Sequence, residues 1–162
     1  MKKIITLIPV LLLVFFVSCK KDSKTPASGS YYVKFQFNGT QKQYTAAVTG
    51  ILGSSASPDG CDIIGYASGT HPAGVTISIV DNSAITTNKA YTQAVGIFTY
   101  VDESGIAYVA GSSFENTSFN LTITEIASDH IKGTFSASLQ KEGTPIEYVN
   151  ATNGEFYVNR LQ

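Results

Sequence analysis

Apolar and polar residues alternate one by one along most of the chain from Tyr31 onward. Residues 33–37, for example, place Val, Phe and Phe on one side and Lys and Gln on the other. A period of two is typical of a β-strand with one buried face, and no sustained helical spacing accompanies it. The pattern therefore predicts an all-β domain.

Eleven short strands can be placed on this pattern, at residues 33–37, 43–46, 62–67, 75–79, 90–93, 95–101, 106–110, 119–126, 131–139, 146–149 and 155–158. Asn38 and Gly39 suit a two-residue hairpin, and the Gly, Ser and Pro content of residues 50–60 predicts a loop. Asn153-Gly154 indicates either a second hairpin turn or a bulge. This spacing predicts an antiparallel β-sandwich of roughly ten short strands, with a closed up-and-down β-barrel as the alternative.

The predicted strand 131–139 shows the strictest alternation in the C-terminal third. Its apolar or small residues fall on one side and its polar residues on the other. Phe135 is therefore predicted to lie in the core. His130, just before this strand, and Asp102 are predicted to be exposed loop residues whose loss changes stability little.

The first thirty residues follow a different pattern, which predicts export. Lys2 and Lys3 precede an apolar run at 4–17 that contains Pro9 and is shorter than the roughly 20 residues of a spanning helix. Residues 1–18 are therefore predicted to be a signal peptide that is removed. Residues 19–30 comprise Cys19 and a polar stretch that is predicted to be a flexible tether. A single all-β domain is predicted at 31–162.

The residues next to the cysteine, Phe16-Val17-Ser18-Cys19, resemble the bacterial lipobox, although Phe16 stands where leucine is usual. The resemblance implies that Cys19 carries a diacylglyceryl thioether and an amide-linked acyl chain such as palmitate. Several acyl chains together anchor a protein stably in a membrane. The alternative is an ordinary signal peptide that is cut at another small residue.

Gly133-Thr134-Phe135-Ser136 and Asn153-Gly154-Glu155-Phe156, with the opening "YYVKFQFNGTQKQYTA", resemble a group of uncharacterised Bacteroidota cell-envelope lipoproteins. The matched pieces cover less than half of the domain, and their motifs are structural. The resemblance implies an all-β envelope lipoprotein of the outer membrane, on its periplasmic or surface face. It brings no catalytic residue with it.

The charge of the predicted domain excludes one class of partner. Residues 31–162 contain six basic and eleven acidic side chains, and no basic stripe. Because nucleic-acid binding needs such a stripe, no nucleic-acid partner is expected. Cys61 has no partner for a disulfide once Cys19 is lipidated, and we expect a buried thiol rather than a reactive one.

The sequence predicts no catalytic, metal-ligating or cofactor-binding residue. His71 and His130 lack companions at ligand spacing, so a metal role is not predicted. The acidic pairs Asp59 with Asp62 and Asp102 with Glu103 stand beside glycines, where acids usually serve turns. A glycosidase carboxylate pair and a calcium site are the alternatives.

Nine tyrosines and no tryptophan stand in the predicted domain, and tyrosine is useful on binding surfaces. The sequence therefore predicts a lipid-anchored binding or adhesion module that is not an enzyme. It contacts the membrane through Cys19, and the partner to be considered is a glycan or a protein. The alternatives are an interaction subunit of an envelope complex, which an apolar patch on one sheet face would indicate, and a hydrolase that uses the acidic loops.

Overall fold

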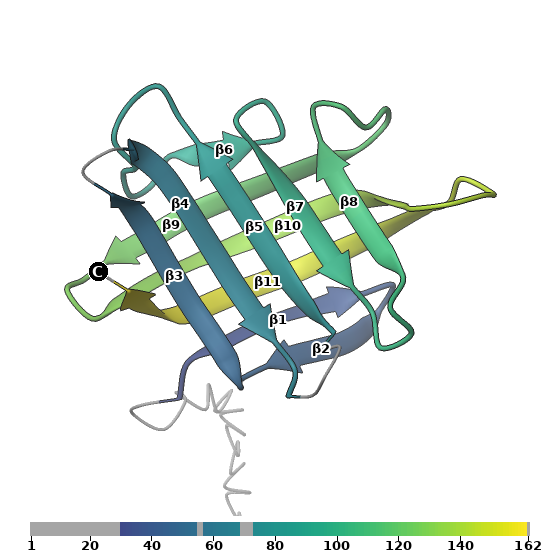
Figure 1. Ribbon diagram of the computed structural model, residues 1–162, viewed down its shortest axis with the longest axis horizontal. Helices are drawn as coiled ribbons and strands as arrows, with labels where there is room; N and C mark the ends of the chain where they lie inside the picture. Colours follow the sequence, from purple (N-terminus) through teal and green to yellow (C-terminus); the bar gives the residue numbers. More distant parts are fainter. Residues whose placement is uncertain (1–29, 55–56, 69–72, 162) are drawn as a thin grey trace, which may run out of the picture.

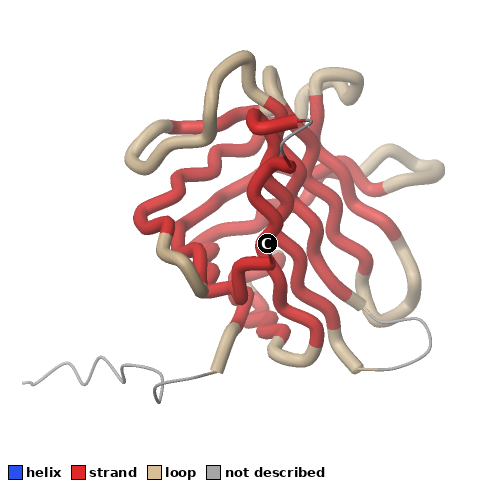
Figure 2. The backbone as a smooth tube through the Cα atoms, turned by 60° about the vertical axis from the view of Figure 1, so that its left-hand side comes forward, coloured by secondary structure: helices blue, strands red, loops and turns tan. Residues whose placement is uncertain are grey.

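Strands make up most of the described backbone, and no helix occurs within it (Figure 2). The structure is a computed structural model that describes residues 30–54, 57–68 and 73–161. No helix in these ranges has the length and apolar character needed to cross a bilayer. The strands are β1 (Tyr32–Phe37), β2 (Thr40–Tyr44), β3 (Ala47–Ser54), β4 (Ser57–Tyr66), β5 (Gly74–Val80), β6 (Ala90–Thr92), β7 (Gly96–Val101), β8 (Ala107–Gly111), β9 (Ser118–Ile126), β10 (His130–Lys141) and β11 (Tyr148–Leu161). The prediction of an all-β fold is confirmed.

Hydrogen bonds join these strands into one sheet in the order β2-β1-β11-β3-β4-β5-β7-β8-β10-β9-β6. β10 also pairs with β11. The pairings β11-β3-β4-β5-β7-β8-β10 therefore close into a ring. Figure 1 shows β3, β4, β5, β7 and β8 as a layer that crosses in front of β9, β10, β11 and β1. The choice between a sandwich and a barrel stays a prediction, since the pairings form a ring while the strands form two crossing layers.

β10 and β11 are the two longest strands, and they connect the two layers. β10 pairs with β9 along residues 131–138 and then with β8 at Gln140 and Lys141. β11 pairs with β1 along residues 151–157 and then with β3 at residues 159–161. The β11–β3 pairing is parallel, which corrects the prediction of a purely antiparallel arrangement. β11 extends beyond the part that pairs with β1, and its last residues run beside β3 in the same direction.

Apolar side chains from both layers fill the space between them. On β10 the buried residues are the alternate ones that the sequence pattern predicts, and Phe135 is 5% exposed. Full burial of one large apolar side chain contributes about 1.5–3 kcal/mol. The largest fully buried side chains come from eight different strands and are Phe35, Ile63, Ile77, Ile79, Tyr91, Phe98, Tyr100, Leu121, Ile123, Ile131, Leu139 and Phe156.

Two glycine–phenylalanine pairs hold β10 against β11. Gly133 lies opposite Phe156, and Phe135 lies opposite Gly154. A Cβ atom on Gly133 would collide with the Phe156 ring and the Thr122 carbonyl oxygen, and a Cβ atom on Gly154 would collide with the Phe135 ring. Each ring therefore occupies the space over the glycine of the other strand, an arrangement in which glycine permits close approach. This packing explains why both strands carry the sequence Gly-x-Phe.

Two of the predicted strand boundaries are wrong, and the open choice at Asn153-Gly154 is decided. Residues 50–60 were predicted to be a loop, but residues 50–54 belong to β3 and residues 57–60 to β4, while residues 55 and 56 lie outside the described residues. Gly50 does not mark a turn there, because a Cβ atom at this position would collide with Val158 and Ile131. Residues 146–149 and 155–158 are not two strands, since β11 runs through both from residue 148. Asn153 has φ 52° at a register shift in β11, so the alternative of a bulge is confirmed and the hairpin turn is wrong.

The hairpin at Asn38-Gly39 is confirmed. Both residues have positive φ, 47° and 79°, and Phe37 pairs with Thr40 across the turn. Positive φ at both central positions is the geometry of a type I′ turn, which matches the twist of antiparallel strands.

We predict that Gly154→Ala destabilises the domain by about 1–3 kcal/mol, because the added methyl group overpacks the Phe135 ring. Gly111→Ala is the matched control, since it is also a buried glycine but its Cβ atom would lie 3.4 Å from Ile97 Cγ1, an ordinary contact. The measurement is the midpoint of urea unfolding. Equal midpoints for the two variants would contradict the packing argument.

Candidate ligand-binding face

The side of β9, β10 and β11 that faces away from the core carries small, uncharged polar side chains over the middle of these strands, with the charged Lys132 and Glu155 toward one end. The alternation that turns Phe119, Leu121 and Phe135 inward turns their neighbours outward. The register places these neighbours side by side, with Ser136 next to Asn120 and Ser138 next to Ser118. We call this surface the polar face; it consists of Ser118, Asn120, Thr122, Thr134, Ser136, Ser138, Asn150, Thr152 and Asn153.

Two open hollows adjoin each other on the polar face. The first has a volume of about 440 Å³ and lies over Ser118, Asn120, Ser138 and Asn150, with Ala137 and Ala151 beneath them. The second has a volume of about 360 Å³ and lies over Thr134, Asn153 and Glu155. Asn120 and Ser136 line both hollows, so the two form one continuous trough along β10.

The bulge in β11 shapes the second hollow. Lys34 and Gln36 of β1 are two residues apart, but their partners on β11 are Glu155 and Thr152, three residues apart. The extra residue is Asn153, and its side-chain nitrogen donates a hydrogen bond to Gln36 Oε1 over 3.1 Å. A bulge bends its strand and redirects side chains, and it is often found beside functional sites.

Most polar groups of this face have no partner within the described part of the chain. Asn153 donates to Gln36, whereas the hydroxyl and amide side chains of the other eight members form no hydrogen bond with described residues. A hydroxyl or amide side chain can donate and accept at the same time. The polar face therefore offers donors and acceptors to a ligand without any formal charge of its own.

The charges nearest to the hollows are paired with each other. Glu155 lies at one end of the second hollow, and Lys34 Nζ lies 2.8 Å from its carboxylate. The hydrogen bond to Glu155 raises the pKa of Lys34 above its usual value, although partial burial acts against it. Neither hollow is lined by a lysine, arginine or histidine.

Tyrosines stand beyond both ends of the trough. Tyr148 lies two residues before Asn150 on the same face of β11, is 45% exposed, and donates from its hydroxyl to the Glu115 carbonyl oxygen over 3.3 Å. Tyr157, at the other end, lies 5.2 Å from Tyr31 and 6.3 Å from Tyr32 between ring centres. Tyr32 lies on the face of β1 opposite to that of the buried Val33 and Phe35.

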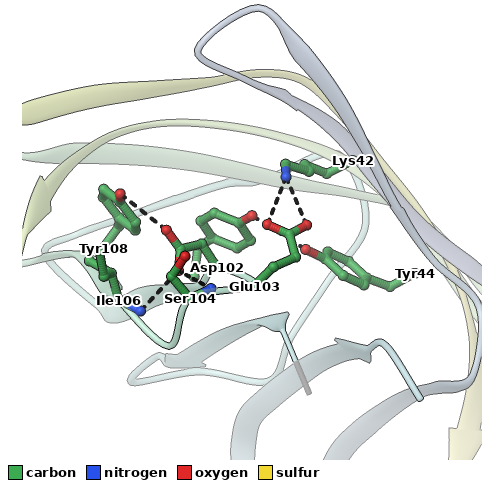
Figure 3. A network of polar contacts seen from close by, with 8 residues as sticks. Lys42, Tyr44, Asp102, Glu103, Ser104, Ile106 and Tyr108 are labelled. Atoms are coloured by element: carbon green, nitrogen blue, oxygen red, sulfur yellow. Dashed lines mark hydrogen bonds and ion pairs between the residues drawn. The ribbon is translucent and has the colours of Figure 1, made fainter. Parts of the chain in front are cut away.

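Asp102 and Glu103 form the turn between β7 and β8, and they do not line the polar face (Figure 3). Asp102 Oδ1 accepts hydrogen bonds from the backbone nitrogens of Ser104 and Ile106 at 2.8 and 2.9 Å. The prediction that Asp102 serves a turn is confirmed. It is half-buried rather than an exposed loop residue, because the hydroxyl of Tyr108 also donates to it over 3.4 Å.

Glu103 closes one end of the core together with Lys42. Lys42 Nζ donates to both carboxylate oxygens of Glu103 at 2.8 and 2.9 Å, and this contact lowers the pKa of Glu103 (Figure 3). Beneath it, the hydroxyl of Tyr44 donates to that of Tyr100 over 3.5 Å. Burial raises the pKa of both tyrosines. These hydroxyls are therefore neutral and structural.

Asp59 and Asp62 lie within β4 and not in a turn, which corrects the prediction for this pair. Asp62 pairs with Ser78 near one end of β5. At the other end of β5, Gly74 pairs with the last residue of β7, and Asp102 comes directly after that residue. The two acidic pairs therefore lie at opposite ends of the same layer. They cannot act on one substrate as a glycosidase pair, which must be within about 10 Å.

Cys61 is a buried thiol, as expected. It is 2% exposed, and burial raises its pKa to about 12. A thiol that stays protonated is a poor nucleophile.

His130 is not an exposed loop residue, and that prediction is wrong. It begins β10, and its side chain is 13% exposed. Its ring lies 4.9 Å from that of Tyr157, Nδ1 lies 2.8 Å from Asp129 Oδ1, and Nε2 lies 3.1 Å from Glu125 Oε1. His71 and Cys19 lie outside the described residues. Within the described ranges, no group of three or more His, Cys, Asp or Glu side chains could hold a metal ion.

The polar face was not identified from the sequence. Its members were visible as the polar positions of strands 119–126 and 131–139, but only the register of three strands brings them together. The available indication was their composition, because the outward positions are Ser, Thr and Asn where Lys and Glu are more usual on a solvated face.

Comparison of the chain with protein-family models, with curated proteins and with solved structures finds no match.

We predict that His130 couples the stability of the domain to acid pH. Hydrogen bonds from His130 lower the pKa of Asp129, and those from Lys132 and His130 lower the pKa of Glu125. A carboxylate with a lowered pKa stabilises the fold above its ordinary pKa, and this stabilisation is lost as the pH falls through the lowered value. Urea midpoints should therefore fall more steeply below the ordinary values of 3.8 and 4.5 in the wild type than in His130→Gln.

The matched control for His130→Gln is Lys89→Gln, which removes the partner of Asp81, a carboxylate with a lowered pKa elsewhere in the chain. The contribution of His130 is the difference between the pH profiles of the wild type and His130→Gln, and Lys89→Gln shows how far the loss of a partner changes the profile at an unrelated carboxylate. Superimposable profiles for His130→Gln and the wild type would contradict the coupling.

Proposed function

We propose that this protein is a lipid-anchored, non-enzymatic binding module of the bacterial cell envelope, and that its ligand binds to the polar face. The observation that carries the proposal is the trough along β10, in which adjoining hollows are lined by hydroxyl and amide groups that, apart from Asn153, have no hydrogen-bond partner among the described residues. Binding sites place a few polar groups on a largely preformed concave surface. Here the surface is fixed by three hydrogen-bonded strands.

The anchor in this proposal is the lipid on Cys19, which the lipobox resemblance implies. Residues 20–30 then connect the lipid to the start of β1, and a flexible chain of this length spans roughly 20 Å. The domain would work close to the membrane, at the periplasmic or surface face of the outer membrane. The group of Bacteroidota envelope lipoproteins that the sequence resembles is consistent with this place of action.

A second candidate function is that of an interaction subunit in an envelope complex. Four large apolar side chains are exposed on the layer opposite the polar face or beside it: Ile51 at 39%, Val80 at 64%, Ile97 at 40% and Leu161 at 43%. Ile51 pairs with Leu161, and it lines a hollow of about 270 Å³ together with Val80. The Asp62 carboxylate also lines this hollow and interrupts the apolar surface, so the polar face takes precedence.

We predict that Cys19→Ala abolishes lipid attachment and releases the protein from the membrane. Metabolic labelling with an alkyne fatty acid, followed by membrane fractionation, measures both effects. Cys61→Ala is the matched control and should keep the label, because Cys61 is buried in the domain. Unchanged labelling of Cys19→Ala would contradict the anchor.

We predict that Ser136→Arg abolishes ligand binding, because the new side chain fills the trough where its two hollows meet. Ser78→Arg is the matched control, since Ser78 lies on β5 in the opposite layer. The full-length protein in detergent is immobilised, and the mass that it retains from an envelope extract is measured. Both variants must keep the free energy of unfolding in urea within about 0.5 kcal/mol of the wild-type value, as surface substitutions usually do. Equal retention by Ser136→Arg and Ser78→Arg would contradict the polar face as the binding site.

A further inference from the structure

We infer that the ligand of the polar face is a neutral glycan that lies along β10 and β11. The inference rests on the proposed function and adds the chemical class of the ligand and its direction on the sheet. Four features of the polar face support it: the chemistry of its side chains, its lack of charge, its position inside the sheet, and the tyrosine beyond its end.

The first feature is the match between side chains and sugar hydroxyls. A sugar hydroxyl both donates and accepts hydrogen bonds, and a side chain that does both can meet it in either role. Ser, Thr and Asn side chains do so, whereas Lys and Arg only donate and ionised Asp and Glu only accept. In the first hollow every polar lining side chain is a Ser, Thr or Asn.

The second feature is the absence of a cationic side chain around the hollows. Their lining includes one acidic residue, Glu155, which is paired with Lys34 at 2.8 Å. Recognition of phosphate, sulfate or carboxylate groups usually employs Arg or Lys. An anionic glycan or lipid headgroup would find no such partner in the trough, and a strongly cationic ligand would find one carboxylate that is already neutralised.

The third feature excludes the main way in which a sheet binds a peptide. An extended peptide adds a strand at a free sheet edge, where backbone groups are unpaired. The two strands at the centre of the trough have no such edge, since residues 131–138 of β10 lie between β9 and β11. Residues 151–157 of β11 likewise lie between β10 and β1. A ligand of the trough must therefore bind through side chains.

The fourth feature is the length of the trough and the exposed ring beyond it. Residues on one face of a strand recur every 6–7 Å, so Thr134, Ser136 and Ser138 extend over about 14 Å. Tyr148 continues this direction past Asn150, and its hydroxyl is held by the Glu115 carbonyl oxygen. A rigid aromatic ring of this kind supplies apolar contact area at low entropic cost. It suits the C–H face of a sugar ring.

The test is affinity electrophoresis of the full-length protein in a non-ionic detergent, in gels that contain a defined polysaccharide. The probes are dextran, mannan, laminarin and galactan as neutral chains, and alginate and polygalacturonate as anionic ones. We expect at least one neutral chain to retard the wild type. Retardation should change little between about 0.05 and 0.5 M salt, because uncharged contacts are not screened.

The variants locate the binding site. Ser136→Arg and Tyr148→Ala should each weaken retardation at least tenfold, whereas Ser78→Arg should leave it unchanged. Tyr148→Phe separates the roles of the ring and its hydroxyl, and it should keep most of the affinity if the ring is what contacts the sugar. Urea midpoints of all variants are compared with the wild type, so that a folding defect is not mistaken for lost binding.

The outcomes distinguish failure of the neutral-glycan inference from failure of the proposed binding function. Retardation by anionic chains alone, or by none of the polysaccharides, overturns the neutral glycan. The wild type is then compared with Ser136→Arg in the envelope-extract experiment. If the wild type retains mass and Ser136→Arg does not, the proposed binding module is supported, with a ligand of another class. Retardation by a neutral chain that Ser136→Arg leaves intact overturns the polar face as the site in both proposals.

Discussion

The packing of Phe135 over Gly154 and of Phe156 over Gly133 fixes the register between β10 and β11. A shift of β10 by one residue relative to β11 would turn Phe135 to the outer face and bring Thr134 into the core. β10 and β11 also pair with strands of both layers, β10 with β8 and β9, and β11 with β1 and β3. Their register therefore decides how the two layers meet, and the rest of the sheet depends on it.

The same register creates the polar face. When Phe135 and Phe156 point inward, Thr134 and Ser136 must point outward beside Asn120. The bulge at Asn153 lies directly before Gly154, so the strand bends next to the pair of rings that holds it in place. A candidate binding surface thus stands on a closely packed part of the sheet, whose backbone fixes the positions from which its hydroxyl and amide side chains project.

Local sequence patterns predicted the buried faces of strands with strict alternation and the first hairpin. They failed for residues whose surroundings are set by strands distant in the sequence. Alternation placed Phe135 in the core, and Asn38-Gly39 gave the first hairpin. Gly50 suggested a loop because composition cannot tell a turn from a strand glycine that admits Val158 and Ile131. His130 was assigned to the surface because nothing in the local sequence shows that β9 brings Glu125 to its ring. The polar face was missed for the same reason, since it belongs to three strands at once.

The distribution of charge shows how such a face could work on an anchored protein. Seven of the eleven acidic residues of the domain lie in the connections between strands: Asp81, Asp102, Glu103, Glu115, Asp129, Glu142 and Glu147. Because most acidic side chains lie at the ends of the strands, Glu155 is the one acidic residue that lines the trough. Each neutral hydrogen bond contributes only about 0.5–1.5 kcal/mol net, so one trough binds weakly. Many copies anchored on one membrane would bind a repeating ligand together, and their avidity would exceed the affinity of any single site.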